Sequence, residues 1–192
     1  MYGYAKLMAE LTLKAYYKDF GLKSASCRFF TVYGPHAKED HAIMAMMARA
    51  FIHQDPFEVW GNGEQIRNWT YVQDIVDGVI LAAERIDDGT AINLGTTERI
   101  RVIDAVHMIL EMFDYKPEIR KLLDMPVGPM NRVADNSKAK ELLGWEPKFS
   151  LRAGLIKTVE WYRANRTPEQ VKQILANGGL LKRKVEVTAA VK

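Results

Sequence analysis

A tyrosine and a lysine lie four residues apart near the start of the sequence, at Tyr2 and Lys6. Apolar residues recur at helical spacing from Tyr4 to Phe20, and a spacing of four places two side chains on one helix face, one turn apart. A tyrosine that acts as acid or base near neutral pH needs a pKa below its unperturbed value of about 10, and a nearby ammonium group favours the phenolate. The pair could exchange a proton with a substrate hydroxyl, although a single short spacing also arises by chance.

Metal and disulfide chemistry have little support in the sequence. The four histidines, His36, His41, His53 and His107, show no metal-ligand spacing. Cys27 is the single cysteine, so no internal disulfide can form, and its apolar neighbours predict a buried strand thiol. We expect no metal site.

Composition and charge narrow the class of protein. The chain has 192 residues, of which 48% are apolar and 27% are charged, values typical of a soluble globular protein. The formal net charge of +3 comes from the last residues, 182–192, so we expect no nucleic-acid partner beyond weak contacts of this basic tail. The apolar stretches are too short to cross a bilayer and the N-terminus does not resemble a secretory signal, which predicts a cytoplasmic protein with no membrane partner.

The order of helical and strand patterns predicts an α/β or α+β class. The pattern predicts helices at 4–20, 42–54, 75–83, 102–113 and 151–165, a short helix that ends at Gly144, and another after Thr167. Strands are predicted at 24–32 and 91–94, and Asn62-Gly63 predicts a hairpin of 57–60 with 66–72. Asp74 is expected to cap the helix that follows it.

Further motifs follow the Tyr2 and Lys6 pair in a fixed order, namely Arg28–Pro35, Val59–Asp74, Ile92–Gly95, Arg132–Asp135 and Leu142–Pro147. This succession resembles the C-terminal half of the extended short-chain dehydrogenases, the NAD-dependent nucleotide-sugar epimerase/dehydratase family. The resemblance implies an α/β fold, the C-terminal part of an extended Rossmann-type short-chain dehydrogenase with a mixed α/β substrate-binding subdomain.

The resemblance also implies a division of the chain. Residues 1–35 would be a remnant of the Rossmann-type domain, with the catalytic helix and the strand after it. Residues 36–165 would form the nucleotide-sugar-binding subdomain, and residues 166–192 a C-terminal helix and basic tail.

Catalytic and cofactor roles follow from the same resemblance. Tyr2 would be the acid/base and Lys6 its partner, and both would contact the cofactor, Lys6 through the nicotinamide ribose. Tyr33, Gly34 and Pro35 resemble the loop beside the nicotinamide. The implied chemistry is hydride transfer from a sugar carbon to NAD, rather than NADP, while the tyrosine takes the hydroxyl proton.

Five residues resemble the family's substrate contacts. Arg67 matches the arginine that grips the nucleotide diphosphate, and Arg132 resembles a second diphosphate contact. Val59 and Trp60 would line the nucleotide pocket, and Thr31 stands where many relatives have a phosphate-binding asparagine. Surface roles for both arginines and a core role for Trp60 remain open as alternatives.

The segment Met125–Gly128 departs from the pattern, because it lacks the arginine of the Arg-Pro-Gly that many relatives carry near this point. We therefore expect a lighter or differently built phosphate clamp.

A Gly-rich dinucleotide fingerprint is absent from the sequence, since Gly61-Asn62-Gly63 lies between two predicted strands. The expectation is a truncated C-terminal portion of an isomerase or lyase, inactive alone, with the main NAD-binding half outside this chain. The alternative is a non-catalytic nucleotide-sugar-binding module, or a subunit completed by a separate NAD-binding chain. A homo-oligomer is also expected, through Leu7, Leu11 and Leu13.

Overall fold

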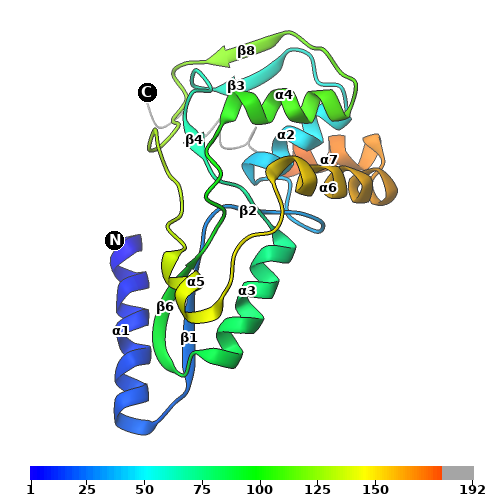
Figure 1. Cartoon of the computed structure of the whole chain (residues 1–192). Helices are drawn as coiled ribbons and strands as arrows, with labels where there is room; N and C mark the ends of the chain where they lie inside the picture. The colour runs from blue at the N-terminus through cyan, green and yellow to red at the C-terminus, as the bar shows by residue number, and fades with distance from the viewer. Residues whose placement is uncertain (179–192) are drawn as a thin grey trace. The chain divides into compact units, whose positions relative to one another are not determined.

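The computed structural model describes residues Met1–Gly178, drawn in colour in Figure 1. The expected basic tail lies outside the described residues. The chain forms two compact units, each assembled from three segments. The first unit contains 1–32, 68–98 and 133–149, and the second contains 33–67, 99–132 and the residues from 150 onward.

A pair of parallel strands forms the centre of the first unit. β1 (Ser24–Phe29) pairs with β6 (Asp88–Leu94), with Cys27 opposite Ile92. Helix α1 (Tyr2–Phe20) lies on one side of this pair and α3 (Val72–Arg85) on the other, as Figure 1 shows. The sheet therefore has a helix on each face, which is the usual environment of parallel strands.

The core of the first unit lies on the α3 side of the sheet, where α5 (Ser137–Leu143) completes it. Its buried side chains are Ile75, Ala82, Ile86, Ile92, Leu94, Ala139, Leu143 and Trp145. The Trp145 indole N–H donates to the main-chain oxygen of Asp74 at 2.9 Å, which satisfies the one polar atom of this ring inside the core.

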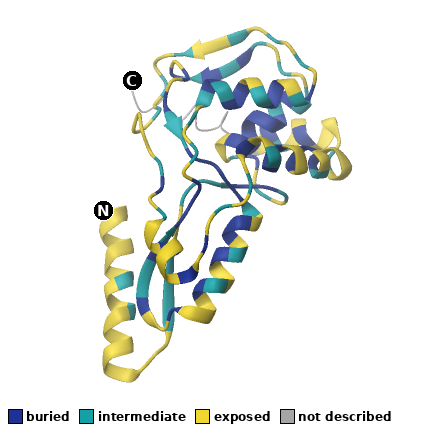
Figure 2. Cartoon of the chain, viewed as in Figure 1, coloured by how far each residue is buried: buried dark blue, intermediate teal, exposed yellow. Residues whose placement is uncertain are grey.

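Helix α1 covers the other face without burying a side chain. The helix ends at Gly21 in the left-handed conformation, with φ of 67°, as the sequence predicts. Gly89 lets the helix approach β6, because a Cβ at this position would lie 3.0 Å from the backbone nitrogen of Lys14. None of the residues of α1 is buried, and the helix is almost entirely exposed in Figure 2.

The second unit combines four helices with short strands. β3 (Phe57–Trp60) pairs in parallel with β8 (Ile119–Leu122), and β4 (Ile66–Arg67) pairs antiparallel with β7 (Ile100–Arg101). The helices of this unit are α2 (Ala42–Phe51), α4 (Val102–Met112), α6 (Leu151–Asn165) and α7 (Pro168–Gly178). Of the two remaining short strands, β5 (Thr70–Tyr71) belongs to the first unit, and β2 (Val32–Tyr33) has one residue in each unit.

Helix α2 is the most deeply buried element of the second unit. Met44, Met46 and Met47 are buried on it, which confirms that these methionines fill the core. The ring of Phe51, at its end, packs edge-on against Phe113 and Tyr162. These aromatic contacts join α2, α6 and the end of α4.

The predicted hairpin of 57–60 with 66–72 is wrong. The strand at 57–60 hydrogen-bonds to β8 instead, since the N–H of Phe57 donates to Glu118 O at 2.8 Å and that of Gly61 to Leu122 O at 2.8 Å. Gly61 and Gly63 do adopt positive φ, so the turn exists, but the four-residue β8 carries no alternating pattern that reveals it as a partner.

Two predictions about single residues in the first unit also fail. Asp74 does not cap its helix, because α3 begins at Val72; its carboxylate accepts from the backbone N–H groups of Lys148 at 2.8 Å and Phe149 at 3.1 Å. Cys27 is half-buried rather than buried, and burial raises the pKa of its thiol.

The predicted start of the last helix is confirmed. The Thr167 hydroxyl accepts from the backbone N–H of Gln170 at 3.3 Å, and Pro168 is the first residue of α7.

Candidate functional site

The tyrosine and lysine of the candidate acid/base pair lie on one face of α1. The Lys6 Nζ is 5.4 Å from the centre of the Tyr2 ring, which confirms the geometry expected from the spacing of four. Tyr2 is 79% exposed, and Lys6 is exposed as well. The phenol and the ammonium are therefore both open to a ligand.

The residues of the candidate cofactor loop differ in exposure. Tyr33 is buried, and its hydroxyl donates to Leu151 O at 3.0 Å, so the ring anchors the start of the loop to α6. Gly34 is buried and Pro35 is half-buried. Backbone atoms, rather than the phenol of Tyr33, are the groups that this loop can offer to a cofactor.

Thr31 lies in the first unit, between β1 and β2. Its side chain is half-buried, and its carbonyl oxygen accepts from the N–H of Thr70 at 2.8 Å. The backbone bond fixes the position of the residue, and its role toward a substrate phosphate stays a prediction.

Val59 and Trp60 point to opposite faces of β3, as adjacent strand residues must. Val59 is buried in the second unit, and Trp60 is half-buried. The Trp60 carbonyl accepts from the side-chain amide of Gln65 at 3.2 Å. The arrangement is compatible with a core role for Val59 and with a partly open face for Trp60.

The guanidinium group of Arg67 donates three hydrogen bonds to carbonyl oxygens. Its Nη1 donates to Ile66 O at 2.8 Å and to Pro129 O at 2.6 Å. Its Nη2 donates to Val127 O at 2.5 Å. The sequence predicts the arginine but not these carbonyl partners, because they lie in an irregular segment without a periodic pattern.

A second arginine lies close to the first. Burial lowers the pKa of Arg67, and the positive charge of Arg132 lowers it further. The two residues are held next to each other by the backbone, since the N–H of Arg132 donates to Ile66 O at 3.3 Å. Two neighbouring guanidinium groups form a place where an anion such as a phosphate is stabilised.

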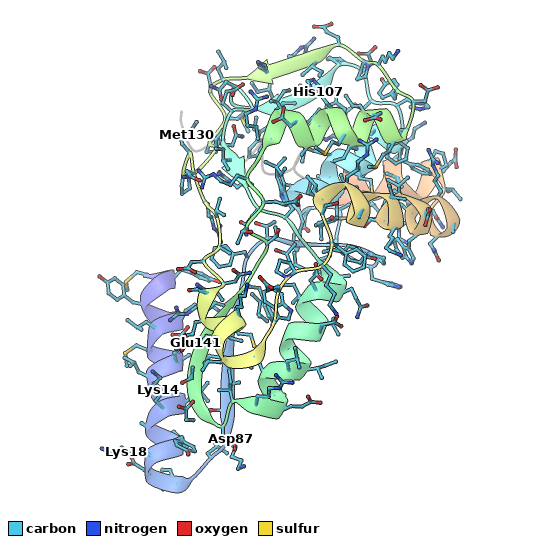
Figure 3. All side chains as sticks on the ribbon, in the orientation of Figure 1. Lys14, Lys18, Asp87, His107, Met130 and Glu141 are labelled. Carbon is cyan, nitrogen blue, oxygen red and sulfur yellow. The ribbon has the colours of Figure 1, made fainter. Side chains whose placement is uncertain are left out.

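The segment that leads to Arg132 packs on the turn after β3. A Cβ on Gly61 would overlap the Cγ1 of Val127, so only glycine leaves room for that side chain. Met130, labelled in Figure 3, follows on the same segment beside β4, and its carbonyl accepts from the N–H of Ile66 at 2.8 Å. The arginine pair therefore sits on a backbone that is hydrogen-bonded on both sides.

Two further features, a metal site and a membrane-spanning helix, concern residues 1–178. Within this range no group of three histidine, cysteine, aspartate or glutamate side chains could hold a metal ion. In the same residues, no helix has the length and apolar character to span a membrane.

The amino-acid sequence of this chain matches a known protein family. The profile of the NAD dependent epimerase/dehydratase family matches residues 1–95. GDP-mannose 3,5-epimerase of Arabidopsis thaliana is 33% identical over 175 residues, which cover 89% of this chain and 46% of that protein.

Solved structures agree with the sequence matches. UDP-glucose 4-epimerase of Thermotoga maritima, in complex with UDP-glucose, is 32% identical with a TM-score of 0.75, over 85% of this chain and 53% of that one. UDP-glucuronic acid 4-epimerase of Bacillus cereus, in complex with UDP-glucuronic acid and NAD, has a TM-score of 0.76 at 29% identity, over 86% and 53%.

The chain belongs to the NAD-dependent epimerase/dehydratase family. The expected α/β fold of an extended short-chain dehydrogenase is thereby confirmed. The chain spans about half the length of the curated relatives that it matches.

The family match covers most of the candidate residues. The matched range 1–95 contains the Tyr2 and Lys6 pair and Arg67, while Arg132 lies beyond it. The relatives differ in nucleotide, since one acts on a GDP-sugar and another is solved with UDP-glucose. A diphosphate is the chemical group that these two nucleotide sugars share.

Proposed function

We propose that this chain supplies the acid/base pair and the nucleotide-diphosphate site of an NAD-dependent nucleotide-sugar epimerase or dehydratase. The observation that carries the proposal is the closeness of two arginines. The N–H of Arg132 donates to Ile66 O beside Arg67, and the positive charge of Arg132 repels that of Arg67 and adds to the effect of burial in lowering the pKa of Arg67. An anion with two phosphate groups would relieve this repulsion.

In this proposal the second unit binds the nucleotide. Arg67 and Arg132 contact the diphosphate, and Val59 and Trp60 border the base or ribose. In the first unit, Thr31 donates its hydroxyl to a phosphate oxygen of the substrate.

Tyr2 and Lys6 would perform the proton transfer. Tyr2 takes the proton of a sugar hydroxyl, and Lys6 contributes positive charge and binds the nicotinamide ribose. Bound NAD accepts the hydride from the sugar carbon. The phenol and ammonium on one exposed face of α1 fit this cofactor, and the backbone of Tyr33–Pro35 would border its nicotinamide.

The 192-residue polypeptide is proposed to be inactive alone. Its sequence holds no Gly-rich strand, turn and helix for the dinucleotide, and Tyr2 lies open to water rather than in an enclosed site. We also propose self-association through α1, whose exposed side chains include Leu7 and Leu11.

Calorimetry with UDP-, dTDP- and GDP-sugars, each with and without NAD, tests the proposal. Binding of at least one sugar nucleotide is expected. Failure of the wild-type chain to bind any of them would contradict the diphosphate site, and turnover by the chain with added NAD would contradict its inactivity.

The alternative is a nucleotide-sugar-binding module without catalysis. It is favoured by the fact that the arginine pair and its backbone partners all belong to the second unit. Sugar-nucleotide binding with no affinity for NAD would support the module. Affinity for NAD that disappears in Lys6→Met would support the enzymatic role.

A further inference from the structure

Most of the hydrogen-bonding capacity of Arg67 is used within the protein. Three of the five N–H groups of its guanidinium donate to carbonyl oxygens, two of which, on Val127 and Pro129, belong to the segment 123–132. In the described chain, the Nε–H and one Nη2–H have no protein partner. These two adjacent nitrogens suffice for a side-on contact with a phosphate group.

The same segment is also held by contacts on either side of the two carbonyls. The backbone bonds of Ile66 with Met130 and Arg132 hold its far end, and the packing of Val127 on Gly61 holds its near end. Between these points the carbonyls of Val127 and Pro129 face the guanidinium. Pro126 and Pro129 have no N–H of their own with which to join a ladder.

The sequence of this segment accounts for the arrangement. Met125-Pro126-Val127-Gly128 has no basic side chain, and its contact with Arg67 is made by the carbonyl oxygen of Val127. Gly128 has φ of 67° and lies against the Arg67 Nη2, at 3.7 Å from the position of a Cβ. A glycine here lets the chain turn so that carbonyls on both sides of it reach one guanidinium.

We propose that Arg67 is a positioning residue for residues 127–131 in addition to a ligand of the diphosphate, so that one guanidinium couples nucleotide binding to the order of this segment. The coupling rests on the proposed function, but the positioning does not. A diphosphate on the Nε side fixes the guanidinium plane, and a fixed plane holds the Val127 and Pro129 carbonyls more firmly.

Hydrogen exchange of the whole 192-residue chain, read by mass spectrometry over residues 123–132, tests both statements. Wild type is compared with Arg67→Met, with Arg67→Lys and with the control Arg101→Met. Arg101 lies opposite Ile66 in the β4 and β7 pair, and its guanidinium binds the carboxylates of Asp104 and Glu64 instead of the segment. Each sample is measured without ligand and with saturating UDP.

Without ligand, exchange over 127–132 is expected to rise about tenfold or more in Arg67→Met, because the two bonds from a charged donor to this segment are lost. Arg67→Lys keeps the charge but cannot span both carbonyls, so a smaller rise is expected, and Arg101→Met should match wild type. Equal exchange in wild type and in a folded Arg67→Lys or Arg67→Met would overturn the positioning role.

With UDP, exchange over the same residues should slow further in wild type and in Arg101→Met, but not in Arg67→Met. UDP that binds wild type without slowing this exchange would overturn the coupling. If UDP does not bind wild type at all, the proposed function fails, while the ligand-free comparison still decides the positioning role.

Discussion

The two units of this chain differ in how far they use their own apolar residues. In the second unit, seven residues of the ten in α2 are buried, and α4 and α6 of the same unit pack against this helix. In the first unit, α1 has nineteen residues and buries none of them. The same helical pattern thus yields a core element in one unit and an exposed helix in the other, because the residues that the helix meets decide its burial.

The candidate site residues follow this difference. The Arg67 and Arg132 pair is held by backbone bonds inside the second unit. Tyr2 and Lys6 are placed by α1 alone, and their contact with each other is the one that fixes them within the described residues. The second unit should therefore form the proposed diphosphate site by itself. The proposed acid/base pair has the one-turn geometry of its helix, but both of its side chains are exposed.

The largest expected effect comes from removing a core side chain of the second unit. Phe57 has no exposed surface, so Phe57→Ala should lower the free energy of unfolding by about 3–5 kcal/mol. The matched change in α1, Leu11→Ala at a side chain that is 50% exposed, should alter it by less than about 0.5 kcal/mol. Urea unfolding followed by circular dichroism measures the free energy of unfolding of both variants. Similar losses of stability in the two variants would contradict the difference between the units.

The next largest effect is expected from removing a buried carboxylate of the first unit. Asp74 is 1% exposed and accepts two backbone N–H groups, so Asp74→Ala should cost about 1.5–3 kcal/mol of stability. Asp77 lies one turn away and makes a 3.6 Å ion pair with Lys148, so Asp77→Ala serves as the control and should cost less than about 1 kcal/mol. Equal effects in urea unfolding would mean that α3 is as loosely held as α1.

The smallest effect concerns how α1 is attached to the sheet. Arg28 donates to both carboxylate oxygens of Glu10, and this pairing lowers the pKa of Glu10. A lowered pKa in the folded state stabilises the fold above the pKa of the unfolded chain, about 4.3, and the contribution is lost as the pH falls through the folded-state value. The difference in melting temperature between wild type and Glu10→Gln should therefore shrink from pH 6 to pH 3, and a constant difference would contradict the pairing.

Patterns within single elements were predictable from the sequence. The helix that ends at Gly21, the cap at Thr167 and the buried methionines of α2 depend on neighbours a few residues away. The one-turn geometry of Tyr2 and Lys6 follows for the same reason.

Contacts between distant segments were not predictable in this way. The pairing of β3 with β8 joins strands some sixty residues apart, and the short β8 has no alternating pattern. The carboxylate of Asp74 binds residues that lie 74 and 75 positions away along the chain, although its position before an apolar run favours a cap. The carbonyl partners of Arg67 could not be predicted, because every residue has a backbone carbonyl and the sequence does not show which of them a side chain will meet.

The affinity of UDP for Arg67→Met and Arg101→Met, measured by calorimetry beside wild type, tests most directly whether the second unit holds a diphosphate site. The account predicts that wild type and Arg101→Met bind UDP equally, and that Arg67→Met binds at least about tenfold more weakly, because a charged contact to phosphate is lost. Equal affinity in Arg67→Met and Arg101→Met, or no binding by wild type, would contradict it.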